Sequence, residues 1–100
     1  MARRREIVWT PGALNDLDEI VAYISRDSTT SGIAFLDDVL NSAESLVTLS
    51  DRGRIVPELA DPQVRELFIK SYRLFYEVQG DEVHVLGILH GAREFKGRHS

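Results

Sequence analysis

The chain has 100 residues and a mass of 11.3 kDa, which is enough for one domain and too short for two. Hydrophobic residues make up 43% and charged residues 28%, a globular composition that excludes general intrinsic disorder. The formal charge of −4 argues against a broad nucleic-acid-binding surface, and the absence of cysteine excludes disulfides, thiol nucleophiles and thiolate metal sites. We therefore expect one domain over residues 1–100, with flexible ends at 1–5 and 94–100.

The N-terminal triplet Arg3-Arg4-Arg5 resembles the start of an export signal. Only Ile7-Val8-Trp9 follows it before Thr10-Pro11-Gly12, whereas an export signal needs about 7–15 apolar residues. Apolar runs such as Ile20 to Ile24 have five residues, far below the roughly 20 that span a bilayer. The sequence therefore predicts a cytoplasmic protein without membrane contact.

The first half predicts a short strand followed by two helices. Ile7-Val8-Trp9 favours a strand, and Thr10 is expected to cap the helix that follows. Apolar residues then recur every three or four positions from Leu14 to Ile24 and again from Leu36 to Val47, which is the pattern of two amphipathic helices. Together they predict an antiparallel hairpin whose apolar stripes face one core.

The polar stretch at residues 25–32 is expected to form the turn between these helices. It consists of serine, threonine, aspartate, arginine and glycine, all compatible with turn chemistry. Thr30 or Ser31 is the expected cap of the second helix.

In the second half the hydrophobic period drops to two, which predicts three strands at residues 65–70, 72–78 and 82–90. Gln79-Gly80-Asp81 is expected to be a tight hairpin connection, and Ile55-Val56 could form a further short strand. The middle strand has aromatic residues on both faces, so one face should pack on the helices and the other be partly solvated. The predicted fold class is α+β: an N-terminal strand and an antiparallel two-helix hairpin packed on a three- to four-stranded, mainly antiparallel sheet.

Three candidate chemical sites are weak. The segment from Gly87 to Gly91 lacks the third glycine and following helix of a phosphate loop. His84 and His90 are six residues apart on one strand, roughly 20 Å at strand rise, which is too far for one metal ion. The side chains of the adjacent carboxylates Asp37-Asp38 and Asp18-Glu19 should point in different directions from their helices. We interpret them as parts of solvated helix faces.

Basic residues of the second half form the more informative set. Residues 1–50 carry 4 basic and 8 acidic groups, whereas residues 51–100 carry 8 of each. The strand and loop positions concerned are Arg52, Arg54, Arg65, Arg73, Arg93 and His90. They could line a concave surface that holds phosphates or carboxylates. Alternatively, several could pair across strands with the nearby carboxylates Glu58, Asp61, Glu66 and Glu77.

An ordered series of segments carries a family pattern. The opening helix has the run Ala-x-x-Asp-Leu-x-x-Ile-x-x-Tyr-Ile over residues 13–24. Further segments follow in order at suitable spacing: Ala34-Phe35, Leu46, Gly53 to Glu58, Val64 to Leu67, Tyr72 to Val78, and Val83 to Arg93. The set, which covers roughly residues 6–93, resembles the RelE/ParE toxin superfamily. That resemblance implies a helical hairpin packed on an antiparallel sheet.

The resemblance also implies a toxin of a type II toxin–antitoxin pair, whose branches act differently. RelE-like members cut messenger RNA on the ribosome by acid–base chemistry, whereas ParE-like members are associated with poisoning DNA gyrase. Arg73 matches the strand arginine of the ribonucleases and His90 lies near their late catalytic region, so these two are the candidate catalytic residues if the chain is a ribonuclease. The two lysines, the lack of a tyrosine after His90 and the charge of −4 favour the ParE-like branch, a binding inhibitor without catalytic residues. A ribosome-dependent endonuclease and a non-toxic partner of an antitoxin are the alternatives.

The partner implied by the resemblance is a ParD-like antitoxin, acting as a dimer in a hetero-oligomer, with an acidic amphipathic C-terminal segment that folds on the toxin. The matching feature of this chain would be a groove with apolar walls and a basic rim. We expect its residues to be Arg54, Arg65, Arg73, Arg93, Leu17, Val21 and Ile24. DNA gyrase is the expected target, and no cofactor, metal, membrane or direct nucleic-acid contact by the chain alone is expected.

Overall fold

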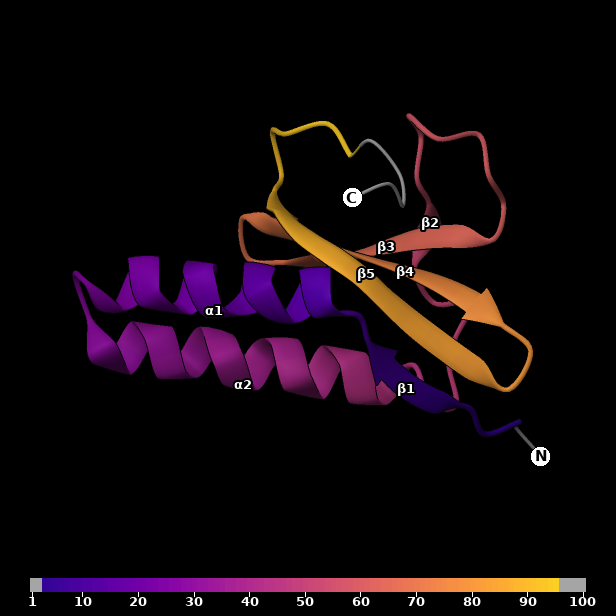
Figure 1. The fold of residues 1–100 in the computed structure, drawn as a ribbon, viewed down its shortest axis with the longest axis horizontal. Helices are drawn as coiled ribbons and strands as arrows, with labels where there is room; N and C mark the ends of the chain where they lie inside the picture. The colour runs from indigo at the N-terminus through magenta and orange to yellow at the C-terminus, as the bar shows by residue number, and fades with distance from the viewer. Residues whose placement is uncertain (1–2, 96–100) are drawn as a thin grey trace.

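The computed structural model describes residues 3–95 and has the predicted α+β class. Figure 1 shows a helical hairpin beside a twisted sheet. The elements in chain order are β1 (Glu6–Trp9), α1 (Pro11–Ser25), α2 (Thr29–Ser45), β2 (Arg54–Ile55), β3 (Val64–Ile69), β4 (Tyr72–Gln79) and β5 (Glu82–His90).

The sheet has five strands in the order β1-β5-β4-β3-β2. Four of them form the expected antiparallel meander, with β2 as a two-residue edge strand. The fifth is β1, which pairs in parallel with β5 so that Ile7 lies opposite Val83. The sheet is therefore mixed and larger than the three to four strands predicted, because the N-terminal strand joins it through a contact between distant parts of the sequence.

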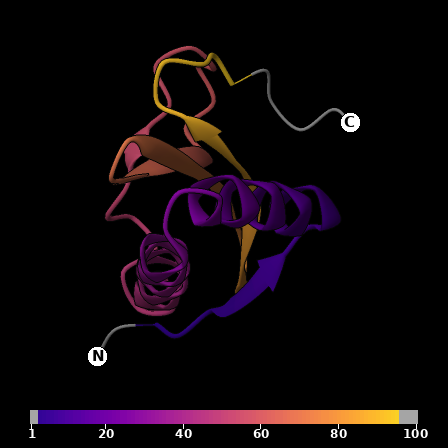
Figure 2. The ribbon, with the colours of Figure 1, turned by 90° about the vertical axis from the view of Figure 1, so that its left-hand side faces the viewer.

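Helices α1 and α2 cover one face of this sheet (Figure 2). Buried residues from both helices and from β3, β4 and β5 form one core there, in which Phe35, Leu46, Leu74 and Tyr76 are at most 1% exposed. The apolar stripes of the two predicted helices supply that core, which confirms the hairpin interpretation.

The opposite face, called the outer face below, carries a second and smaller core. It is built from Val56, Val64, Phe75 and Phe95, which come from β3, β4 and the segments that precede β3 and follow β5. The rings of Phe75 and Phe95 stack with centroids 4.0 Å apart and planes 9° apart. Both segments arch over the side of the sheet away from the helices (Figure 1), so they cover part of the outer face.

The helix caps agree only partly with the prediction. Thr10 caps α1 as expected, because its hydroxyl oxygen accepts a hydrogen bond from the Ala13 N–H at 3.2 Å. The cap of α2 is Ser28, which accepts from the Ser31 N–H at 3.1 Å, so the prediction of Thr30 or Ser31 is wrong. The turn is shorter than residues 25–32, and Gly32 lies inside α2. A Cβ there would approach the Ser25 hydroxyl oxygen to 2.0 Å, so glycine permits the close contact between the helices.

A β-bulge lies where Phe75 and Tyr76 face β5. Phe75 is opposite Gly87 but Tyr76 is opposite Val85, which leaves one extra residue on β5. The extra residue reverses the alternation of side chains along β5. His84 and His90 therefore do not share a face, contrary to what uniform alternation predicts.

The Tyr76 hydroxyl fixes the chain between α2 and β2. It accepts a hydrogen bond from the Gly53 N–H at 2.9 Å and donates one to the Ser50 carbonyl at 2.8 Å. Burial raises the pKa of Tyr76, so the hydroxyl remains a donor at neutral pH. A Cβ at Gly53 would lie 2.6 Å from both the Glu66 carbonyl oxygen and this hydroxyl, so only glycine fits here.

Within residues 3–95, no helix is long and apolar enough to cross a membrane. The expectation of flexible ends concerns residues 1–5 and 94–100, of which 1–2 and 96–100 lie outside the described residues. Of the rest, Arg5 donates to the Gly80 carbonyl at 2.9 Å and Phe95 is buried.

We expect Tyr76→Phe to lower the free energy of unfolding by about 1–3 kcal/mol, because the substitution leaves the buried Gly53 N–H and Ser50 carbonyl without their partner. Tyr72→Phe is the matched control, since the Tyr72 hydroxyl makes no hydrogen bond with any described residue. Urea unfolding followed by circular dichroism measures both. Equal losses for the two variants would contradict the role assigned to the Tyr76 hydroxyl.

Candidate functional site

Arg73 lies at the centre of a polar cluster on the outer face. Strand β4 alternates its side chains, so Arg73 points to the same side as Phe75 while Tyr72 points toward the helices. The Arg73 guanidinium lies 4.8 Å from the Phe75 ring centroid and is 7% exposed. Its Nε donates to Glu66 at 2.6 Å and its Nη2 donates to Glu58 at 2.9 Å. Arg73 is therefore a buried cation held by two carboxylates.

Arg54 completes this cluster, which we call the arginine network: Arg54, Glu58, Glu66 and Arg73. The Glu66 side chain is fully buried and binds the Arg54 guanidinium as well as that of Arg73. Two positive and two negative groups thus balance each other. Of the two possibilities left open by the sequence, pairing between strand arginines and nearby carboxylates is the one observed for Arg54 and Arg73.

The network also holds the C-terminal segment. Glu58 accepts a hydrogen bond from the Phe95 N–H at 3.0 Å, and the Arg73 Nη1 donates to the Arg93 carbonyl at 3.0 Å. The hydrogen bond from Arg73 lowers the pKa of Glu58 from 4.5 to about 2, assisted by the Phe95 N–H. The cluster therefore joins β3, β4 and the chain segments on both sides of the meander through charge.

The four predicted rim arginines do not lie on one rim. Arg54 is 57% exposed at the outer face, whereas Arg73 is buried in the network beside it. Arg65 points to the helix side, where its Nη1 donates to the Gly53 carbonyl at 2.7 Å. Arg93 is exposed beyond the end of β5. Alternation along β3 separates Arg54 from Arg65, because Arg54 binds the neighbouring Glu66 on the other face.

The predicted apolar wall lies mainly in the core. Leu17 is 6% exposed, and Val21 and Ile24 are half-buried against the same core. The apolar side chains that the hairpin leaves in solvent are Leu14, Tyr23, Ile33 and Leu40, each at least 45% exposed. Leu14 and Leu40 belong to the apolar stripes that were predicted to face the core, so for these two residues that prediction is wrong. Ile33, Leu36 and Leu40 recur at helical spacing, so a search for the edge of the apolar stripe could have found them.

His90 and Arg73 occupy opposite faces of the sheet. The His90 ring packs against Tyr72, with centroids 5.5 Å apart and planes 79° apart, and accepts a long hydrogen bond from the Ala92 N–H at 3.4 Å. It lines a small hollow between α1 and the end of β5. The hollow has a volume of about 180 Å³ and is lined by Asp16, Glu19, Ile20, Tyr72, Ile88, Leu89, His90 and Arg93.

The described residues contain no group of three or more histidine and carboxylate side chains arranged to hold a metal ion. Gly87 is a strand residue of β5 rather than part of a phosphate-binding loop. The Ile88 N–H next to it donates to Asp16 of α1 at 3.0 Å, and a Cβ at Gly87 would lie 3.1 Å from that carboxylate. The contact serves the packing of α1 on β5.

We expect Glu58→Gln to destabilise the protein by about 3 kcal/mol at pH 7, since lowering a pKa from 4.5 to about 2 corresponds to that much stabilisation by the charged form. The folded-state pKa is depressed, so this stability is present above about pH 4.5 and is lost as the pH falls toward 2. The difference between wild type and variant should shrink over the same interval. Urea unfolding between pH 7 and pH 2.5 measures it.

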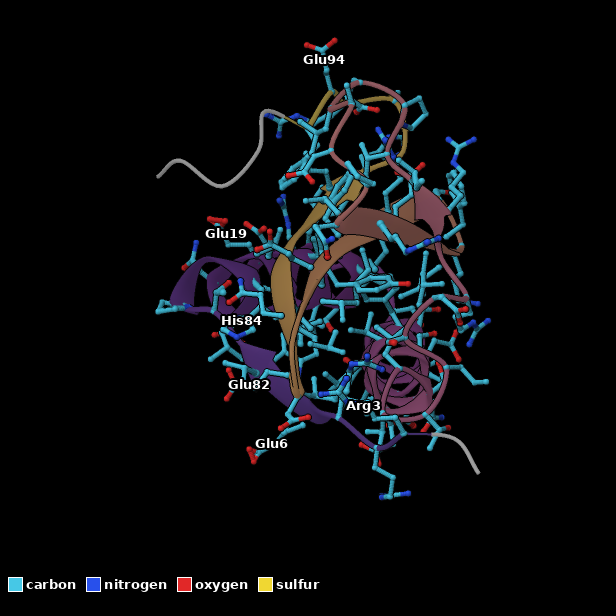
Figure 3. The ribbon with its side chains drawn as sticks, turned by 90° about the vertical axis from the view of Figure 1, so that its right-hand side faces the viewer. Arg3, Glu6, Glu19, Glu82, His84 and Glu94 are labelled. Atoms are coloured by element: carbon cyan, nitrogen blue, oxygen red, sulfur yellow. The ribbon has the colours of Figure 1, made fainter. Side chains whose placement is uncertain are left out.

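Glu94→Gln is the control for this experiment. Glu94 lies one residue from Phe95 but points into solvent at the tip of its segment (Figure 3) and makes no hydrogen bond or ion pair with the described residues. It should change stability little at any pH. A Glu58→Gln variant as stable as the control at pH 7 would contradict the role assigned to the network.

Comparison with known proteins identifies the family. A sequence model of the family described as "ParE toxin of type II toxin-antitoxin system, parDE" matches residues 7–95. Toxin RelE2 of Caulobacter vibrioides is 35% identical over 89 residues, which cover 88% of this chain and 97% of the relative. A structure of the chromosomal ParDE TA system from P. aeruginosa matches with a TM-score of 0.71 at 23% identity, covering 87% of this chain and 96% of that chain.

The structural match shows a shared fold, and the sequence matches go further. They span both helices and reach all five strands, including the segment that closes the arginine network. The chain therefore belongs to the ParE toxin family of type II toxin–antitoxin systems.

Proposed function

We propose that this toxin arrests growth by binding DNA gyrase, and that a ParD-like antitoxin neutralises it in the cytoplasm. The hydrogen bonds of the Arg73 guanidinium favour a binding inhibitor over a ribonuclease. Three of its guanidinium nitrogens already donate to Glu66, Glu58 and the Arg93 carbonyl. Three of its five N–H donors are used in this way and the side chain is 7% exposed, so little of the guanidinium is accessible to a phosphate.

The position of His90 supports the same choice. A ribonuclease site needs a proton-transfer group and a phosphate-binding cation on one surface. Here His90 packs on Tyr72 at the helix side, while Arg73 lies on the outer face. The overall charge of −4 also gives little of the counterion-release free energy that ribosomal RNA binding provides.

The antitoxin-binding surface is proposed to combine the helical hairpin with the exposed Arg54 and Arg93 and the half-buried Arg65. Apolar area is exposed on the hairpin by Leu14, Ile33 and Leu40. The core side of the same hairpin contains Leu17, Val21 and Ile24. Arg54, Arg65 and Arg93 are the candidates for pairing with antitoxin carboxylates. Arg73 would act through the network, by holding Arg54 and the C-terminal segment in place.

Messenger RNA cleavage is the second candidate, favoured by the hollow at the end of β5. Tyr72, His90 and Arg93 line it together with the carboxylates of Asp16 and Glu19, and these are side chains capable of acid–base chemistry. The relative from Caulobacter vibrioides also carries the name RelE2.

A direct assay distinguishes the two candidates. Purified toxin at micromolar concentration should abolish supercoiling by DNA gyrase, while a translating ribosome extract containing the same toxin should keep its messenger RNA intact. Addition of the antitoxin should restore supercoiling. Codon-phased cleavage with normal supercoiling would overturn the gyrase proposal, and the variant His90→Ala would then test the hollow.

Single substitutions on the proposed antitoxin-binding surface should lower the affinity for the antitoxin. Leu40→Asp should weaken antitoxin binding about tenfold or more, because it places an unpaired carboxylate in an apolar contact. Arg93→Glu should weaken it about tenfold by reversing an attractive charge. Isothermal titration with the purified antitoxin measures both, and Arg26→Glu, at the exposed far end of α1, is the charge-matched control. Affinities equal to the control would remove these residues from the interface.

A further inference from the structure

The edge of the sheet formed by β3 is only partly covered. Strand β2 contributes two residues, which pair with Arg65 and Glu66 and no further. The chain before it turns toward the end of α2, where the Arg52 Nη1 donates to the Ser45 hydroxyl at 2.7 Å. The last three residues of β3 therefore have β4 on one side and no described strand on the other.

The register shows which main-chain groups face this open edge. Ile69 and Tyr72 flank a two-residue turn, so they form a hydrogen-bonded pair. From Ile69 backwards along β3, the main-chain N–H and carbonyl groups of successive residues point alternately toward β4 and away from it. Two observed bonds agree with this alternation: the Val78 N–H donates to the Gln63 carbonyl, and the Val56 N–H donates to the Val64 carbonyl, both at 3.3 Å.

The main-chain N–H and carbonyl groups of the odd-numbered residues of β3 thus bond to β4. Those of the even-numbered residues point to the side on which β2 lies. Glu66 meets β2 at its pairing with Arg54, which leaves Phe68 as the next residue with both its N–H and its carbonyl directed outward. Neither group has a partner among the described residues.

The side chains around this edge are apolar and cationic. Phe68 is 58% exposed, and the Arg54 guanidinium lies 5.0 Å from its ring centroid. Lys70, 60% exposed, follows at the turn. A hollow of about 290 Å³ runs beside the edge, lined by Asp38, Asn41, Ser42, Phe68, Ile69 and Lys70.

The guanidinium of Arg54 and the ammonium group of Lys70 are exposed at this edge, and each has one carboxylate partner. Glu66 is fully buried beneath Arg54, and Asp38 meets Lys70 only in an exposed pair at 3.5 Å. The edge therefore places one exposed cationic side chain on either side of an unused donor and acceptor.

We propose that the open edge of β3 receives an extended acidic segment of the antitoxin as an added strand. Main-chain hydrogen bonds to Phe68 would fix its register, the Phe68 ring would contact an apolar side chain, and Arg54 and Lys70 would pair with carboxylates on either side. A second copy of this chain fits less well, because two such edges would bring like charges together. The proposal rests on the antitoxin partnership described above and adds a binding mode to it.

Amide hydrogen exchange tests the main-chain contact without a substitution. In the free toxin the Phe68 amide should exchange rapidly, whereas the Leu67 and Ile69 amides, bonded to β4, should be protected. Binding of the purified full-length antitoxin should slow exchange at Phe68 about tenfold or more. Unchanged exchange at Phe68 in a formed complex would overturn the added strand and leave the antitoxin partnership intact. Failure of the complex to form would overturn both.

Side-chain variants test the rest of the edge. Phe68→Ala should weaken antitoxin binding about fivefold or more, and Leu49→Ala, at a similarly exposed apolar residue outside the hairpin and the edge of β3, is the control. Lys70→Gln should weaken it about two- to fivefold relative to Arg26→Gln. Affinities that match the controls would overturn the side-chain contacts. Size-exclusion chromatography of the toxin alone, at the concentration of the exchange experiment, should give a monomer, and a dimer with a protected Phe68 amide would assign the edge to a second copy.

Discussion

The buried guanidinium of Arg73 is the constraint on which the outer half of this structure depends. A charge removed from water is tolerated only when oppositely charged partners replace its hydration, and Arg73 has two, Glu66 on the adjacent strand and Glu58 on the loop before β3. The same carboxylate of Glu58 holds the Phe95 N–H, and the same guanidinium holds the Arg93 carbonyl. The loop and the C-terminal segment are thereby fixed together, and the Phe75–Phe95 stack closes between them.

This arrangement also determines where charge reaches the surface. The second half of the chain has equal numbers of basic and acidic groups, but the carboxylates of Glu58 and Glu66 are turned inward. Arg54 and Lys70 remain more than half exposed at the edge of β3. A segment that is neutral by composition therefore exposes the cation of the Arg54–Glu66 pair at this edge, because the strand register buries the carboxylate.

Local patterns predicted most of the fold. Helical spacing gave the hairpin, a period of two gave β3, β4 and β5, and the Thr10 cap was recognisable because capping involves residues three positions apart. Contacts between distant segments were not predictable: the parallel pairing of β1 with β5, and the bulge that turns His90 away from the face of His84. The cap of α2 was misplaced because Ser28, Thr30 and Ser31 are chemically similar, and the extended backbone of Ser28 decides among them.

The site was predicted less well than the fold, for a physical reason. An arginine on a strand has the same sequence signature whether it faces a ligand or a buried carboxylate, and the difference lies in the register and in the conformation of the loop at residues 56–63. Alternation along β3 could have separated Arg54 from Arg65 in advance, since the former lies beside Glu66 and the latter points to the helix side. The pairing of Arg73 with Glu58 could not, because that loop has no periodic pattern.

The hydrogen bonds and ion pairs of Arg73 restrict the activities in which its guanidinium can take part directly. Any activity that uses the whole guanidinium would have to free it from Glu58 and Glu66, which would leave Glu58 without a cation and Glu66 with Arg54 alone. The Phe95 N–H and the Arg93 carbonyl would also be loosened, so the C-terminal segment would be released from the outer face together with the charge. Recognition through side chains that are already exposed needs none of these changes. Arg73 therefore acts as a structural cation, which fixes the loop before β3 and the C-terminal segment on the outer face and shares Glu66 with the exposed Arg54.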